Sequence, residues 1–121
     1  MTIMVDVDKI TDAIGRPIDA NIKPLVKQFI RLGVKTTGSC EGHEDHGLPY
    51  PWIDFHFRCL EKVVDLLMCY RTYLRRLGDD MEYIFIPYKT WLRMRPHIDD
   101  LEKAQKEIRR FADFLENIRT D

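Results

Sequence analysis

Between residues 51 and 77 the hydrophobic pattern changes its period, and this change restricts the fold more than any other property of the sequence. Ile53, Phe55 and Phe57 alternate with Trp52, Asp54 and His56, which is typical of a strand with one buried face. The apolar residues of Leu60–Leu77 then recur at helical spacing until Gly78. The presence of both patterns in one chain predicts a sheet with helices packed on it.

The same two patterns recur along the rest of the chain. Helical spacing predicts further helices over Ala20–Leu32 and Asp100–Arg119, the second opened by the capping pair Asp99 and Glu102. Strand patterns predict strands over Val34–Ser39, Pro51–Phe57, Met81–Ile86 and Tyr88–Arg95, with a turn or bulge at Pro87. Because the connections are short, we expect an α+β two-layer sandwich, with a mainly antiparallel four-stranded sheet and helices on one face.

Size and charge limit the classes of protein that remain. A length of 121 residues predicts a single domain over residues 1–121, with residues 1–17 as an edge strand or a loosely ordered segment. A net charge of −1 is unlike that of a dedicated DNA-binding domain. The pattern of a signal peptide and a run of about 18 apolar residues are both absent, so we expect a cytoplasmic protein without a membrane partner. The odd number of cysteines, 3, argues against a disulfide framework.

Polar chemistry is concentrated in the predicted loop Ser39–His46. Cys40, His43 and His46 offer a thiolate and two imidazoles, which are zinc ligands, and three such ligands with an open position are typical of catalytic zinc. If the protein is an enzyme, Glu44 or Asp45 would accept the proton of a metal-activated water. The alternatives are a polar loop without an ion, and Cys40 as a nucleophile, which the neighbouring acids disfavour.

A second polar surface is expected on the face of the sheet that the helices leave open. Alternation places a basic and aromatic set on that face, contributed by two strands: Trp52, His56, Lys89, Trp91, Arg93 and Arg95, with Ser39 joining them from a third. Tryptophans among cations are typical of surfaces that bind single-stranded RNA or a nucleotide. An open face with two tryptophans is equally typical of a homodimer interface, so both hypotheses stay open.

Short motifs in the first half of the chain resemble a group of small uncharacterised bacterial or phage-type proteins. The shared segments are Ile22-Lys23-Pro24-Leu25-Val26, Gly33-Val34-Lys35-Thr36 and Ser39-Cys40-Glu41-Gly42-His43, and they imply a shared fold rather than an activity. The last segment is also remotely similar to the Ser-Cys-Ser-Gly-Arg segment of the wybutosine-synthesis family of tRNA-modifying proteins. That resemblance would imply methyl transfer from S-adenosylmethionine to a tRNA base, but Glu41 and His43 replace the family's serine and arginine.

Overall fold

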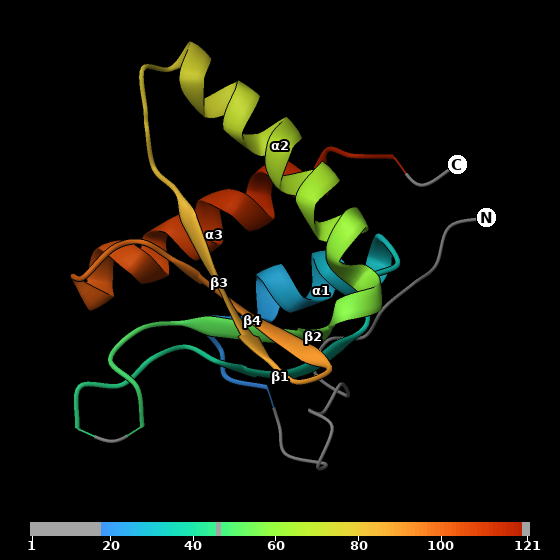
Figure 1. The fold of residues 1–121 in the computed structure, drawn as a ribbon. Helices are drawn as coiled ribbons and strands as arrows, with labels where there is room; N and C mark the ends of the chain where they lie inside the picture. The colour runs from blue at the N-terminus through green and yellow to red at the C-terminus, as the bar shows by residue number, and fades with distance from the viewer. Residues whose placement is uncertain (1–17, 46, 120–121) are drawn as a thin grey trace.

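A computed structural model describes residues 18–45 and 47–119, so the predicted edge strand within residues 1–17 lies outside the described residues. Within the described residues, three α-helices, one short 3₁₀ helix and four strands follow one another (Figure 1). In order they are α1 (Lys23–Arg31), β1 (Thr36–Cys40), β2 (Trp52–His56), the short 3₁₀ helix η2 (Phe57–Cys59), α2 (Leu60–Arg76), β3 (Tyr83–Tyr88), β4 (Trp91–Pro96) and α3 (Leu101–Glu116).

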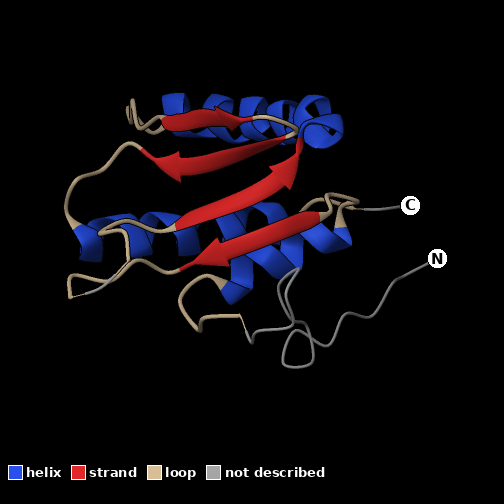
Figure 2. Cartoon of the chain, turned by 60° about the horizontal axis from the view of Figure 1, so that its bottom comes forward, coloured by secondary structure: helices blue, strands red, loops and turns tan. Residues whose placement is uncertain are grey.

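The strands form one antiparallel sheet in the order β1-β2-β4-β3. Figure 2 shows the helices behind this sheet, so that no helix of the described residues covers its other face, which we call the open face. The expected α+β two-layer sandwich is therefore confirmed. Antiparallel pairing follows from the short connections, since parallel neighbours would require long crossovers.

The core lies between the sheet and the helices. Phe55 of β2 and Tyr70 of α2 are fully buried there, together with Phe29 of α1 and Phe111 of α3. The Tyr70 and Phe111 rings stack with centroids 4.5 Å apart, and Phe29 meets Phe111 edge to face at 6.0 Å. Burial of each such side chain contributes about 1.5–3 kcal/mol, which makes this aromatic cluster the main tie between the three helices.

A buried carboxylate joins α3 to its neighbours within this core. Glu107 of α3 accepts hydrogen bonds from the hydroxyl of Tyr70 at 2.9 Å and from that of Tyr83 at 2.8 Å. Arg110 donates to Glu107 at 2.8 Å and to Asp79 at 2.8 Å, so the buried charge has a cation beside it. Burial raises the pKa of Glu107. The pKa values of Tyr70 and Tyr83 are also raised, mainly by burial and to a smaller extent by the charge of Glu107.

The predicted start of the last strand at Tyr88 is wrong, because β3 continues through Pro87. The His97 amide donates to the Glu82 carbonyl at 2.8 Å, which places Glu82 among the residues that bond to β4. Pairing alternates along an antiparallel ladder, so Tyr83, Phe85 and Pro87 direct their backbone groups to the outer edge, where Pro87 interrupts no ladder bond. The chain turns instead at Lys89, whose φ is 52°.

The start of α3 also differs from the prediction by one residue. Asp100, rather than Asp99, is the N-cap, and its carboxylate accepts a hydrogen bond from the Lys103 amide at 2.9 Å. Asp and Asn side chains are among the best N-caps because they satisfy an amide that has no partner within the helix. Two adjacent aspartates cannot be ranked from the sequence alone, since either one could make this bond.

Candidate functional site

Three potential metal ligands converge beside the end of β1. Asp19, Cys40 and His43 each place a ligand atom so that all three lie within 4.8 Å of one another. Nε2 of His43 is 3.6 Å from a carboxylate oxygen of Asp19. Two of the three predicted zinc ligands, Cys40 and His43, thus lie close together, whereas His46 lies outside the described residues. We call these three side chains the Asp-Cys-His cluster.

A glycine brings the two loop ligands together. Gly42 has a φ of +86°, and a Cβ there would lie 2.6 Å from the Tyr50 carbonyl carbon and 2.7 Å from a methyl carbon of Leu101. Neither the conformation nor the space suits a larger residue. The loop is then closed by a 3.0 Å hydrogen bond from the His43 amide to the Leu48 carbonyl. Cys40 and His43 thus lie at the neck of a closed loop rather than along an extended one.

Glu41 fastens this loop to two other parts of the chain. Its amide donates to the Asp19 carboxylate at 3.2 Å, and its carbonyl accepts from the Gln105 side chain of α3 at 2.9 Å. Its own carboxylate accepts a hydrogen bond from the side chain of Asn21. Among the described residues β1 is an edge strand, so the Glu41 amide just after its end is available to Asp19, which explains how a residue before α1 reaches the cluster.

The electrostatics of the cluster disfavour a free thiolate. Burial raises the pKa of Cys40, and the charges of Asp19 and Glu41 raise it further, although the Gly42 amide, 3.4 Å from the sulfur, opposes them. A nucleophilic cysteine needs the opposite environment. The same negative charges favour a bound cation, so the cluster is better suited to a metal ion than to covalent chemistry.

The two carboxylates predicted as proton acceptors are not part of this cluster. Glu44 and Asp45 are exposed in the loop, and neither is among the three residues whose ligand atoms converge. Asp19 is instead the carboxylate that converges with the thiol and the imidazole. Sequence reasoning did not include Asp19, because no local motif connects it to a loop more than twenty residues away.

The register of the sheet decides which of the other predicted residues share the open face. Asp54 pairs with Arg93 and His56 with Trp91, and Trp52 and Arg95 lie two residues away on the same sides. The expected common face of Trp52, His56, Trp91, Arg93 and Arg95 is thus confirmed. Cys40 pairs with Trp52, so the end of β1 that carries the cluster adjoins this face.

Two residues expected on the open face lie elsewhere. Lys89 is in the turn between β3 and β4 rather than in a strand. Ser39 pairs with Ile53 and therefore faces the core, because a register shift between Thr36 and Gly38 inverts the alternation of β1. A one-residue shift moves every following side chain to the other face, and Gly38 at the shift is the one sequence signal for it, since a glycine within a strand often marks a bulge.

Arg93 is held on the open face by a carboxylate and by aromatic rings. Its guanidinium donates to both carboxylate oxygens of Asp54, at 2.8 and 3.0 Å, and lies 3.8 Å from the centre of the Trp52 ring. The pair lies over Gly38 of β1, where a Cβ would make ordinary van der Waals contact with both Trp52 and Asp54 at 3.6 Å. Burial raises the pKa of Asp54, while the Arg93 partner lowers it. The carboxylate fixes the guanidinium flat against the indole.

The remaining aromatic side chains extend this surface in both directions. Tyr88 and Trp91 stack with ring centroids 4.3 Å apart, and the Arg95 guanidinium lies 3.8 Å from the centre of the Tyr50 ring. All four side chains are partly exposed. The open face therefore presents alternating aromatic rings and guanidinium groups, which can stack on planar groups and attract anions.

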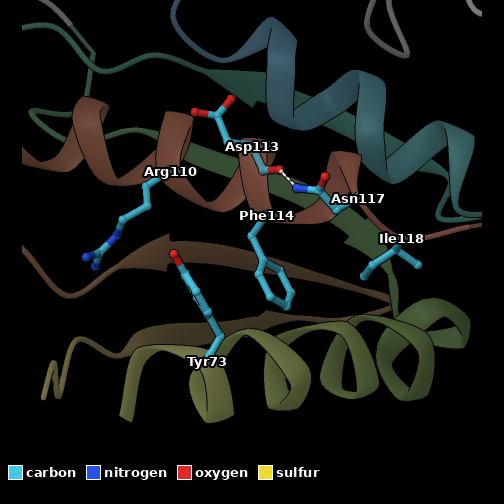
Figure 3. A pocket seen from close by; sticks show the side chains of 6 residues that line it. All are labelled: Tyr73, Arg110, Asp113, Phe114, Asn117 and Ile118. Atoms are coloured by element: carbon cyan, nitrogen blue, oxygen red, sulfur yellow. Dashed lines mark hydrogen bonds between the residues drawn. The ribbon is translucent and has the colours of Figure 1, made fainter. Parts of the chain in front are cut away.

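A groove between α2 and α3 lies apart from both regions. Its volume is about 630 Å³, and Figure 3 shows Tyr73 of α2 facing Phe114 and Arg110 of α3. The Tyr73 and Phe114 rings stack at 5.2 Å, and the Asn117 side chain donates to the Asp113 carbonyl at 3.0 Å. Arg110 is already paired with Asp79 and Glu107, so we assign no ligand to this groove.

Comparison with known proteins identifies no relative: the chain matches no protein-family model, no curated protein and no solved structure. No helix among the described residues has the length and apolar character needed to cross a membrane. The fold and the site together define a two-layer α+β sandwich with an Asp-Cys-His cluster at one edge of the sheet and an aromatic, basic open face.

Proposed function

We propose that this protein binds a zinc-type divalent cation through Asp19, Cys40 and His43. The convergence of a carboxylate, a thiol and an imidazole within 4.8 Å carries the proposal, because these are the three side chains that ligate zinc most often. Bond lengths of about 2.0–2.3 Å place the ligands of one tetrahedral ion roughly 3.3–3.8 Å apart. The 3.6 Å between His43 and Asp19 lies within that range, so this pair needs little rearrangement, and the Cys40 sulfur lies within 4.8 Å of both.

Charge supports the same assignment. A dication deprotonates a coordinating thiol and reverses the effect of the acids that now raise the pKa of Cys40. Three protein ligands leave one tetrahedral position for water or a substrate. His46 stays a predicted further ligand, and a catalytic role with Glu44 or Asp45 as the base stays a prediction that only an activity assay can test.

The test is metal content, measured on protein purified without an affinity tag and equilibrated with zinc. Elemental analysis should find about one ion per chain, as expected for a single tetrahedral site. Cys40→Ser, His43→Ala and Asp19→Asn should each lower this content, whereas Cys69→Ser, an exposed cysteine on α2, is the matched control. Cobalt loading should give a thiolate charge-transfer band that Cys40→Ser abolishes. Full metal content in both Cys40→Ser and His43→Ala would contradict the assignment.

A second candidate function is binding of single-stranded nucleic acid or a nucleotide to the open face. The observation that favours it is Arg93, held flat on Trp52 by Asp54, beside the Tyr88 and Trp91 stack. Bases would stack on such rings and guanidinium planes, and Arg95, beside Tyr50, would contact a phosphate.

Tryptophan fluorescence during titration with single-stranded RNA tests this candidate. Arg95→Ala should weaken binding and flatten its salt dependence, because one phosphate contact is lost. Lys106→Ala, on the exposed side of α3, should change neither. Absence of binding in the wild-type protein would contradict this candidate. If, in addition, Trp91→Glu converts a dimer to a monomer, the open face is an interface between copies instead.

A further inference from the structure

The side of the sandwich formed by β3 and α2 has two unused binding elements. β3 is the terminal strand of the sheet, and no described segment pairs with its outer edge. The alternation of the β3–β4 ladder directs the amides and carbonyls of Tyr83 and Phe85 to that edge. An edge of this kind can accept a further strand, although Pro87, which has no N–H, limits the length of such pairing.

An apolar stripe on α2 adjoins this edge. Leu60, Val64 and Met68 recur every fourth residue and are 36%, 37% and 58% exposed, and Phe57 continues the stripe at 52%. Val64 is about 180° around the helix from Tyr73, which stacks on α3. The stripe therefore points away from α3 and lies on the outer flank of α2.

An ion pair places this flank on the β3 side. Arg71 is seven residues from Val64, which is about 20° around the helix, and it contacts Glu82 at 3.1 Å just before β3. Figure 2 agrees, since α2 lies directly behind β3, the terminal strand of the sheet. The open strand edge and the apolar stripe thus form one continuous side of the molecule, which we call the β3–α2 side.

We infer that the β3–α2 side binds a second copy of this chain. A twofold axis across this side would pair β3 with its copy in antiparallel fashion, so that one sheet continues through both protomers. The same axis sets the two α2 helices antiparallel, with each stripe of Leu60, Val64 and Met68 against the other. The four outward backbone groups of Tyr83 and Phe85 then find partners in the copy.

Charge along α2 selects a second copy rather than an unrelated partner. Glu61 lies near the start of this flank, and Arg75 and Arg71, the second of which also contacts Glu82, lie near its end, all within about 60° of Val64. An antiparallel copy brings the acidic end of one helix to the basic end of the other, so the surface is complementary to itself. Because each protomer uses its only β3 edge, the assembly closes as a dimer.

Light scattering coupled to size-exclusion chromatography over a dilution series tests the inference. The wild-type chain should have the mass of a dimer, and Val64→Glu should halve it without changing the far-ultraviolet circular dichroism. Leu77→Glu is the matched control: Leu77 is 60% exposed on another flank of α2, so this variant should stay dimeric. A wild-type chain that is monomeric at every concentration would overturn the inference.

Amide hydrogen exchange identifies the surface that forms the dimer. The Phe85 amide should exchange at least an order of magnitude faster in Val64→Glu than in the wild-type dimer, because its partner strand is lost. The Ile84 amide, which bonds to β4 within the protomer, should stay protected in both proteins. A dimer that dissociates on Trp91→Glu, while Val64→Glu stays dimeric, would place the interface on the open face and refute the β3–α2 side.

Discussion

Replacing Gly42 with alanine tests how the loop holds the Asp-Cys-His cluster together. The substitution has two separate effects, since the backbone has a φ of +86° and the added Cβ would lie 2.6 Å from the Tyr50 carbonyl carbon. A left-handed conformation costs a non-glycine residue about 1–2 kcal/mol. Overpacking against fixed neighbours costs about 1–3 kcal/mol more. We therefore expect Gly42→Ala to lower the free energy of unfolding by about 2–5 kcal/mol.

Gly33→Ala separates these two effects. Gly33 has a nearly identical φ of +89°, but no atom of the described residues lies within 4 Å of the position that its Cβ would take. This control should therefore show the conformational effect alone, about 1–2 kcal/mol. The difference between the two variants measures how tightly the loop packs against Tyr50 and against Leu101 of α3.

Urea unfolding followed by circular dichroism gives both free energies, and metal content gives the functional consequence. Movement of the loop at Gly42 separates Cys40 from His43, so Gly42→Ala should also bind less zinc than Gly33→Ala does. Equal losses of stability in the two variants would refute the argument that close packing requires glycine in this loop. Unchanged zinc binding in a destabilised Gly42→Ala would show that the cluster does not depend on the closed loop.

Three further predictions concern contacts outside the loop. Because burial raises the pKa of Tyr70 and Tyr83, the folded chain holds these protons more tightly than the unfolded chain, and urea midpoints should fall as pH rises above about 10; Tyr83→Phe should weaken this dependence. Arg93→Met should lower the free energy of unfolding by about 1–3 kcal/mol, because it leaves the Asp54 carboxylate buried without its partner. Adding Asp54→Asn to this variant should restore part of the lost stability, which a double-mutant cycle measures. Asp100→Ala should cost about 1 kcal/mol in thermal unfolding, whereas Asp99→Ala should have little effect, and the reverse order would contradict the N-cap seen at Asp100.

The fold was predictable because burial imposes a period on the sequence. The helical spacing of α2 and the alternation of β2 each reflect one buried face, and the short connections then leave antiparallel pairing as the simple solution. The prediction failed at Pro87 because a proline in a strand is compatible with an outer edge, and the sequence does not tell which strand is outermost. Lys89 was misplaced for the same reason, since the turn moved to it when β3 extended past Pro87.

The candidate site was predictable only where its residues are neighbours in sequence. Cys40 and His43 belong to one loop, and Gly42 between them indicates a tight return, so their proximity follows from local chemistry. Asp19 joins them because β1 lies at the edge of the described sheet and leaves the Glu41 amide, just after its end, open to Asp19, which is a property of the assembled sheet. The sequence already indicates that the acids of the loop disfavour a thiolate at Cys40. The charge of Asp19 raises the pKa of this thiol further. The cluster therefore gains its negative charge from tertiary structure, and that added charge is what makes a cation, rather than a nucleophilic cysteine, the partner to test first.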